Sequence, residues 1–259
     1  MKKKLLSFAI VLMCGSSIAN AWPWMSPYAY CLGNPIIFVD PDGRNPIYDT
    51  EGNFLGTDNM GLQGNYYVMD AKNFKQGMSH QEVGDFAIMG DLSKSVLEKI
   101  DKHYGNLPTR PDYDGFVTVS EGIEWAKSHP DALNNPTPDN TLYLDASKLD
   151  FGSISTSDFP TVGEVTPQNL FNNSNILESA YNPVLFATVY ALGRVNMILQ
   201  NKDNGTVKIV NDPATDYDWN VGGGPKRNTF IRVNNWLTGI DPNKHGFKTY
   251  YYGVGKLRK

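Results

Sequence analysis

The sequence predicts an α+β fold of mixed helices and antiparallel β-hairpins, and three observations support this prediction. Stretches with helix-capping residues and apolar positions at helical spacing occur beside short runs rich in β-branched and aromatic residues. Turn-forming residues are abundant, with 24 glycines and 16 prolines in 259 residues. Only 19% of the residues are charged, which fits a chain rich in strands and loops around a packed core.

The start of the chain has the composition of an export signal. Three consecutive lysines that begin at Lys2 are followed by the apolar run of residues 5–13 and by small residues that end at Ala21. We therefore expect residues 1–21 to be removed near Ala21 and the mature chain to be periplasmic or secreted. Lipid attachment at Cys14 is the less favoured alternative, because a bulky residue precedes it. No stretch of the sequence predicts a membrane span.

Removal of this signal changes the charge and the cysteine count. Three lysines leave with it, so the formal net charge falls from −4 to −7. This bulk charge argues against wholesale nucleic-acid binding. Cys31 is the only cysteine after Ala21, so the mature chain forms no internal disulfide and depends on packing. Because Cys31 lies within an aromatic strand, we interpret it as a packed residue; the alternative is a nucleophile.

Residues 26–44 predict two apolar strands with a turn after each. Pro35 disfavours helical backbone at the residue before it. The apolar run 36–39 suits a buried, pleated surface. Residues 40–43, Asp-Pro-Asp-Gly, have strong turn chemistry, since proline fixes φ and glycine accepts a positive φ.

This stretch resembles the closing segment of the RHS-repeat-associated core domain, which is found in RHS and YD-repeat proteins. The residues that carry the resemblance are Ser26-Pro27-Tyr28, Tyr30, Asn34-Pro35 and Asp40-Pro41-Asp42-Gly43-Arg44. Tyr48-Asp49 and Gly52-Asn53 are similar to one unit of the YD repeat, of which the chain has no further copy. In this family the segment separates a β-strand shell from a variable C-terminal domain that is often a toxin.

The resemblance implies a domain organisation. Residues 22–60 would form a border segment similar to the RHS core, and residues 61–259 a variable C-terminal domain of the toxin type. It also implies an immunity protein as a partner, and only Asp40 and Asp42 match the aspartates of a processing site. Composition suggests a further boundary near residues 152–176, which are expected to form a long surface loop.

Three helices are expected in the region before this loop. Ser79 and Glu82 have the spacing of a capping box, in which the serine accepts a backbone N–H and the glutamate reaches back. Asp91 is expected to cap a second helix that ends before Gly105. Ser120 is expected to cap the third helix.

Strands are expected where β-branched and aromatic residues are bounded by turn residues. The expected segments are a hairpin over 47–56, strands in 63–70 and 141–145, a hairpin over 184–210 and a strand-like segment over 246–257. The clearest is a hairpin whose turn is Lys202-Asp203-Asn204-Gly205.

Positive charge is concentrated at the C-terminal end. Residues 226–259 contain eight lysines and arginines and one acid, Asp241, which gives this segment a charge of +7. A segment with such an excess of positive charge can form a phosphate-facing surface. A helix is expected over residues 228–240, where Phe230, Val233, Leu237 and Ile240 recur at helical spacing. Its start, after a glycine-rich turn, would attract anions.

The candidate site residues lie in this basic segment and just before it. Phosphodiester cleavage of the ribonuclease type needs a base with a pKa near neutrality and cations on the phosphate. His245 is the candidate base, and Arg227 and Lys248 are the candidate cations. Asp216 and Asp218 alternate along a short strand, so both carboxylates would share one face. The structural alternative is that the cations pair with acids and His245 ends a turn.

Two hypotheses about function follow. The first is an exported toxin-like effector that cleaves phosphodiesters and meets nucleic acid through the basic C-terminal third. The second is a non-catalytic exported module that binds a cell-surface partner, for which an aromatic content of 12% is suited. A cell-wall hydrolase that uses Asp216 and Asp218 is a third hypothesis. No cofactor is expected, and no histidine has the spacing of a zinc site.

Overall fold

The computed structural model describes most of the chain after residue 43. The described ranges are 44–88, 90–152, 154–170, 193–211, 215–218, 225–241 and 244–257, with a few positions between 182 and 189. All of them belong to one compact unit, Asp40–Lys259. The predicted signal, the strands of 26–43 and the residues Cys31, Asp40 and Asp42 lie outside the described residues.

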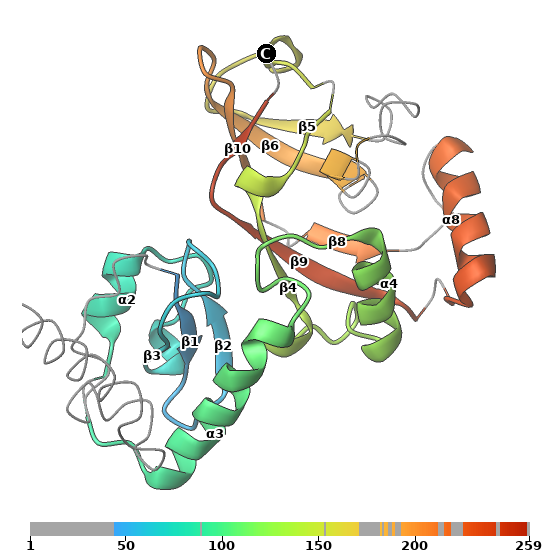
Figure 1. The fold of residues 1–259 in the computed structure, drawn as a ribbon. Coiled ribbons are helices and arrows are strands. Elements are labelled where there is room, and N and C mark those ends of the chain that lie inside the picture. Colours follow the sequence, from blue (N-terminus) through green and yellow to red (C-terminus); the bar gives the residue numbers. More distant parts are fainter. Residues whose placement is uncertain are drawn as a thin grey trace, which may run out of the picture. The chain divides into compact units, whose positions relative to one another are not determined.

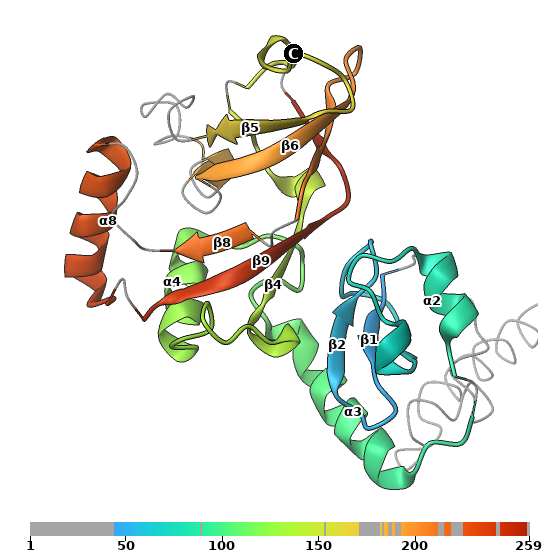
Figure 2. The same cartoon turned by 180° about the vertical axis from the view of Figure 1, so that it is seen from behind.

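The described part has the predicted α+β fold (Figures 1 and 2). Its strands form three small sheets, two with three strands and one with four. Four α-helices accompany them among the described residues. The first sheet is built from chain neighbours, whereas the second and third sheets also pair distant segments, and these distant pairings position the candidate site.

The first sheet has the strand order β2-β1-β3, from β1 (Pro46–Tyr48), β2 (Phe54–Thr57) and β3 (Tyr67–Val68). The antiparallel β1–β2 pair confirms the predicted hairpin. In its turn the Asp49 carboxylate accepts the backbone N–H groups of Glu51 and Asn53, at 2.9 and 2.8 Å. Side-chain hydrogen bonds of this kind specify a turn locally, which explains why sequence alone predicts it.

Helix α2 (His80–Phe86) begins at the predicted capping box. The Glu82 backbone N–H donates to Ser79 Oγ at 3.3 Å, and Ser79 N–H donates to the Glu82 carboxylate at 2.7 Å. These bonds satisfy donors that the first helical turn cannot pair.

The predicted caps of the next two helices are wrong by two residues. Helix α3 (Lys94–Asn106) is capped by Ser93 rather than Asp91, and it includes Gly105. Helix α4 (Val119–Ser128) is capped by Thr118, which forms a capping box with Glu121, while Ser120 lies in the first turn. In each case several capping residues lie close together, and the extended backbone of one of them selects the cap.

The second sheet has β9 (Gly246–Tyr252) at its centre, between β4 (Leu142–Asp145) and β8 (Thr215–Asp218). Strand β9 is parallel to β4 and antiparallel to β8. The β8–β9 register places Asp216 opposite Lys248 and Tyr217 opposite Phe247. This register brings two of the predicted site residues together.

The third sheet is antiparallel, with the order β10-β7-β6-β5. Strands β6 (Arg194–Asn201) and β7 (Thr206–Ile209) form the predicted hairpin, and β10 (Gly255–Lys256) pairs with β7. The prediction is wrong at the start of the first strand, where the described residues 184, 185, 188 and 189 are helical. Strand β5 (Val165–Asn169) falls within the predicted loop 152–176, so that prediction is wrong for these residues. Pairing with β6 along all of β5 overrides a composition typical of loops.

One hydrophobic core joins the second and third sheets to α4. Its buried strand residues include Leu142, Leu144, Val195, Met197, Val207, Ile209, Phe247 and Tyr251. Ile123 and Trp125 of α4 pack against this cluster, and Ala126 belongs to it. The shared core fixes β7 relative to β9, although more than 30 residues separate them in sequence.

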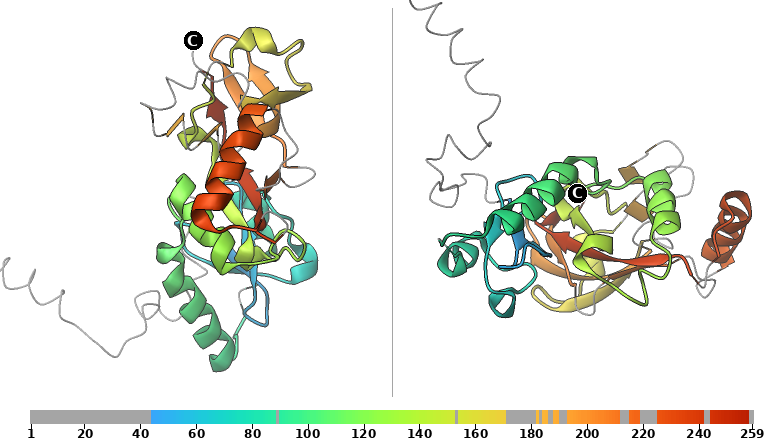
Figure 3. Two further views of the ribbon diagram at one scale, coloured as in Figure 1. Left: turned by 90° about the vertical axis from the view of Figure 1, so that its right-hand side faces the viewer. Right: turned by 90° about the horizontal axis from the view of Figure 1, so that it is seen from below.

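Helix α8 (Pro225–Thr238), shown in Figure 3, confirms the predicted helix. The burial of its side chains does not follow the face that the spacing suggests. Ile231 and Ile240 are both 4% exposed. Val233 and Leu237 are instead 50% and 67% exposed. Periodicity located the helix, whereas the choice of buried face depends on what the helix packs against.

Arg110 and Asp112 form a buried ion pair beside α4 and β4. Arg110 Nε lies 3.0 Å from Asp112 Oδ1, and Arg110 Nη2 lies 3.2 Å from Oδ2. Their side chains are 9% and 0% exposed. Arg110 also donates to the backbone carbonyls of Asp139 and Thr141, and Asp112 accepts the Tyr143 N–H. The pair therefore fixes the start of β4.

A second buried carboxylate, Asp58, lies near the first sheet. It accepts backbone N–H groups from Asn45 at 3.2 Å and from Met60 at 2.9 Å. His80 Nδ1 lies 3.6 Å from its Oδ2. Burial raises the pKa of Asp58 from its ordinary value of 3.8 to about 6, and the backbone hydrogen bonds and His80 act in the opposite direction.

This raised pKa predicts a pH dependence of stability. Between about pH 4 and about pH 6 the folded state binds more protons at Asp58 than the unfolded state, so its contribution to stability falls as pH rises. Asp58→Asn resembles the neutral acid and should remove this dependence. Urea unfolding of both proteins across that range measures it. An unchanged pH slope in the variant would contradict the assignment.

Candidate functional site

The β8–β9 pair unites two of the five predicted site residues. Lys248 Nζ forms an ion pair with Asp216 Oδ1 across the two strands. The Lys248 side chain is 23% exposed and that of Asp216 is 47% exposed. A pair this accessible contributes little to stability. Its effect is to hold the Lys248 ammonium group at the surface of the sheet.

His245 lies directly before β9 and is held by a tight turn. The Asp241 backbone N–H donates to His245 Nδ1 at 3.1 Å, and the Asp241 carbonyl lies 2.9 Å from the same nitrogen. The His245 backbone N–H also donates to that carbonyl, at 3.1 Å. Nδ1 is thus engaged by the backbone, which leaves Nε2 as the nitrogen through which His245 would act.

Arg227 and Asp218 are placed by their backbone alone. Arg227 is in the first turn of α8, and Asp218 is the last residue of β8, opposite Gly246. Their side chains lie outside what the structure describes. Asp216 and Asp218 both lie in β8, and the shared face of their carboxylates stays a prediction from sequence.

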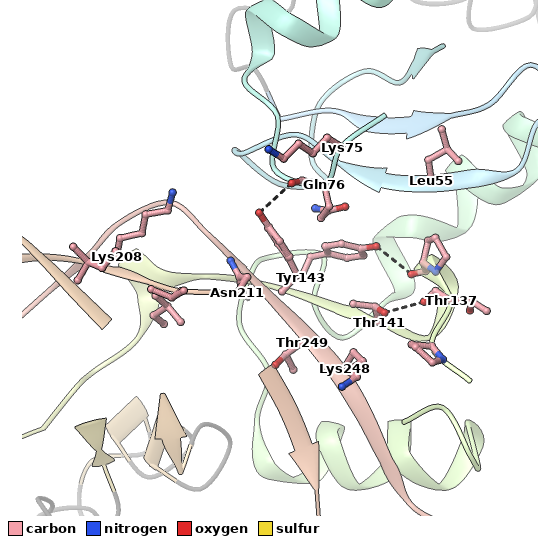
Figure 4. A pocket seen from close by; sticks show the side chains of 16 residues that line it. Leu55, Lys75, Gln76, Thr137, Thr141, Tyr143, Lys208, Asn211, Lys248 and Thr249 are labelled. Atoms are coloured by element: carbon pink, nitrogen blue, oxygen red, sulfur yellow. Dashed lines mark hydrogen bonds between the residues drawn. The ribbon is translucent and has the colours of Figure 1, made fainter. Parts of the chain in front are cut away.

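Lys248 also lines a cavity of about 710 Å³ that the sequence did not predict (Figure 4). Two more lysines reach the same cavity from distant segments: Lys75, which follows the short helix η3 (Ala71–Asn73), and Lys208 in β7. We call this the three-lysine cavity. Its other labelled polar residues include Gln76, Thr137, Thr141, Asn211 and Thr249.

The Lys75 segment is fixed through its neighbours. Gln76 Nε2 donates to the Thr57 carbonyl at 3.1 Å, and its Oε1 accepts the Thr57 N–H at 3.3 Å. Tyr250 Oη donates to the Gln76 carbonyl at 3.4 Å. Gly77 follows with φ of +77°, and a Cβ there would overlap the Tyr250 hydroxyl. This glycine permits both the turn and the close approach to β9.

Lys208 is positioned through the end of its strand. Asn211 Nδ2 donates to the Tyr251 carbonyl at 2.7 Å, and the Tyr251 N–H donates to Asn211 Oδ1 at 2.8 Å. The Asn211 side chain thus acts as a short extra strand partner of β9. It connects the end of β7 to the strand that carries Lys248, which brings both lysines to one cavity.

The three-lysine cavity has the chemistry of an anion site. Lysine side chains from three segments line it, and an ammonium group can bind a phosphate or another anion through charge-assisted hydrogen bonds. Burial raises the pKa of Tyr250, so this lining hydroxyl stays protonated near neutral pH and keeps its hydrogen bond to the Gln76 carbonyl. The described lining residues include no histidine and no carboxylate. The cavity itself therefore favours binding, and a general base would have to come from beside it.

A separate hydrogen-bonded chain runs from Tyr48 through His103 to Asp139. Tyr48 Oη lies 2.8 Å from His103 Nδ1, and His103 Nε2 lies 2.9 Å from Asp139 Oδ1. Tyr48 is fully buried, and burial raises its pKa. No substrate can reach a hydroxyl in this position, so we interpret the chain as a structural link between β1, α3 and η5 (Pro138–Asn140).

The described ranges contain neither a candidate metal site nor a candidate membrane span. No group of three or more histidine, cysteine, aspartate or glutamate side chains there could hold a metal ion. No helix in the same ranges is both long and apolar enough to cross a membrane.

No family model, curated protein or solved structure matches this chain. The resemblance of residues 26–44 to the RHS core segment therefore stays a prediction from those residues.

Proposed function

We propose that this chain is an exported effector of the toxin type whose region 61–259 cleaves a phosphodiester substrate. The observation that supports the proposal is that Lys75, Lys208 and Lys248 all line one cavity. Lysines bind phosphate oxygens through charge-assisted hydrogen bonds. Only Lys248 belongs to the basic C-terminal segment, so the cavity extends the predicted cationic surface to two distant segments.

In this proposal each side chain has a distinct role. The three lysines bind the phosphate and stabilise the negative charge that develops on it during cleavage. His245 acts as general base through Nε2 in the tautomer whose Nδ1–H donates to the Asp241 carbonyl. Arg227 supplies a further cation. Asp216 holds Lys248 in place until substrate competes for it.

A second function, non-catalytic binding, is favoured by one observation. The described lining of the three-lysine cavity provides cations and amides but no histidine or carboxylate. An exported module that only binds an anionic cell-surface partner would need nothing more. The two functions make different predictions for His245, which cleavage requires and binding alone does not.

A growth assay distinguishes the hypotheses. The chain without residues 1–21 is expressed in the cytoplasm of a test bacterium, and the whole chain is exported to the periplasm. Cytoplasmic toxicity that is lost in an Arg227→Ala, His245→Ala variant is the expected result. Toxicity only in the periplasm would favour a cell-wall target and the Asp216–Asp218 pair. Folded protein without toxicity in either compartment would favour the binding module and would remove the need for an immunity protein.

A binding measurement tests the cavity itself. Lys75→Ala, Lys208→Ala removes two exposed phosphate contacts, so the slope of log affinity for single-stranded nucleic acid against log salt should shrink by about 1.5. Fluorescence anisotropy gives this slope. Lys72→Ala, Lys94→Ala is the matched control, since those side chains are 75% and 90% exposed and lie outside the cavity. Equal slopes in both variants would exclude the cavity as the binding site.

A further inference from the structure

Helix α8 exposes three apolar side chains in one stripe. Val233, Trp236 and Leu237 are 50%, 82% and 67% exposed. Residues three and four positions apart lie on the same side of a helix, so the three side chains form a continuous surface. We call them the α8 stripe. Trp236 is the most exposed large hydrophobic residue among those that the structure describes.

The opposite side of α8 is mostly polar. Among the side chains that the structure describes there, Ile231 is apolar and buried, whereas Asn234, Asn235 and Thr238 are half-buried. A surface helix of a soluble protein normally buries its apolar side and exposes its polar side. In α8 this arrangement is reversed, which indicates that the exposed side has a ligand of its own.

The charge of α8 indicates what kind of ligand its exposed side would bind. The helix contains Lys226, Arg227 and Arg232 and no acidic residue. Arg232 is exposed, and it lies one turn from Trp236, beside the stripe. A basic helix with an exposed apolar side containing tryptophan is typical of helices that lie at an anionic membrane surface.

We propose that α8 docks on an anionic phospholipid surface, with the α8 stripe in the interface and Arg232 at the lipid headgroups. The 14 residues of α8 extend about 21 Å, which is shorter than the roughly 30 Å hydrocarbon core, so the helix lies along the surface. Tryptophan is suited to this boundary because its ring is apolar and its N–H is polar.

A lipid surface fits these observations better than a protein partner. The stripe is formed by a single helix, and neither described cavity is lined by a residue of α8. A protein partner would have to supply an apolar groove and acidic groups together, whereas an anionic bilayer supplies both over any area. The proposal concerns attachment, and it does not depend on the proposed phosphodiester cleavage.

Vesicle sedimentation tests the proposal on the whole chain, purified in the form that expressing cells produce. Vesicles of phosphatidylglycerol are compared with vesicles of phosphatidylcholine. We expect binding to phosphatidylglycerol that weakens with salt, and about tenfold or greater loss of affinity in Val233→Ser, Trp236→Ser, Leu237→Ser. Arg232→Glu should weaken binding to phosphatidylglycerol alone.

The matched control is Phe86→Ser, Val165→Ser, which removes apolar side chains that are 45% and 54% exposed elsewhere. It should bind vesicles as the parent chain does. Trp236→Phe should also bind, but it should lose most of the fluorescence quenching that brominated phosphatidylglycerol causes in the parent chain.

Three outcomes would overturn the proposal. They are absence of binding to phosphatidylglycerol, equal binding by the triple variant, and equal quenching in Trp236→Phe. Self-association that disappears in the triple variant, without lipid binding, would assign the stripe to a second copy of the chain instead. Loss of nuclease activity in the His245 variant leaves vesicle binding unchanged, so the two proposals fail separately.

Discussion

Arg110→Ala is expected to lower the free energy of unfolding by about 3–5 kcal/mol, because it leaves a buried carboxylate without its partner. Asp112 is fully buried, and Arg110 binds it through two parallel hydrogen bonds of 3.0 and 3.2 Å. Arg110 also bonds the carbonyls of Asp139 and Thr141, at 2.9 and 2.6 Å. All of these groups lose a donor in the variant.

Chemical denaturation measures this effect against two comparisons. Lys94→Ala breaks the exposed pair with Glu98 and should change stability by about 0.5 kcal/mol or less. Arg110→Met, Asp112→Leu removes both charges and should recover much of the loss, since no unpaired carboxylate stays buried. A loss in Arg110→Ala as small as that in Lys94→Ala would show that water reaches Asp112.

Phe247→Ala is expected to lower the free energy of unfolding by about 3–5 kcal/mol through the cavity it leaves. Phe247 is 1% exposed and lies in β9, the central strand of its sheet. Its ring stacks on that of Tyr217 of β8, with centroids 4.6 Å apart and planes 8° from parallel. Because Phe247 precedes Lys248, loosening of β8–β9 should also weaken anion binding.

Phe86→Ala is the matched control for this variant. Phe86 is the last residue of α2 and is 45% exposed, so its truncation should cost about 1 kcal/mol or less. Thermal or urea unfolding of the two variants gives the comparison. Similar losses would mean that the β8–β9 face is not part of a packed core.

Sequence reasoning succeeded where a few neighbouring residues determine the structure. The Ser79–Glu82 capping box and the Asp49 turn are complete within a few residues, and both form as predicted. The predicted helix caps were wrong where several residues close together could each cap the helix, as at Ser93 and Thr118. The loop prediction was wrong at β5 for another reason. Strand β5 forms by pairing with β6, and residues 165–169 alone do not indicate that partner.

The same distinction applies to the candidate site. Lys248 could be predicted because the cations of residues 226–259 are close in sequence. Lys75 and Lys208 could not, since each is an ordinary surface lysine until the fold brings it to the cavity. The ion pair of Lys248 with Asp216 depends on the β8–β9 register, which 31 intervening residues do not reveal.

The central position of β9 has a consequence for synthesis of the chain. Its parallel partner β4 precedes it by about 100 residues, so β4 emerges from the ribosome long before its neighbour exists. Until residues 246–252 are made, β4 and β8 have no strand between them, and the core they share stays open. Folding of this sheet is therefore a late event governed by long-range contacts, and chains that stop before Gly246 cannot complete it.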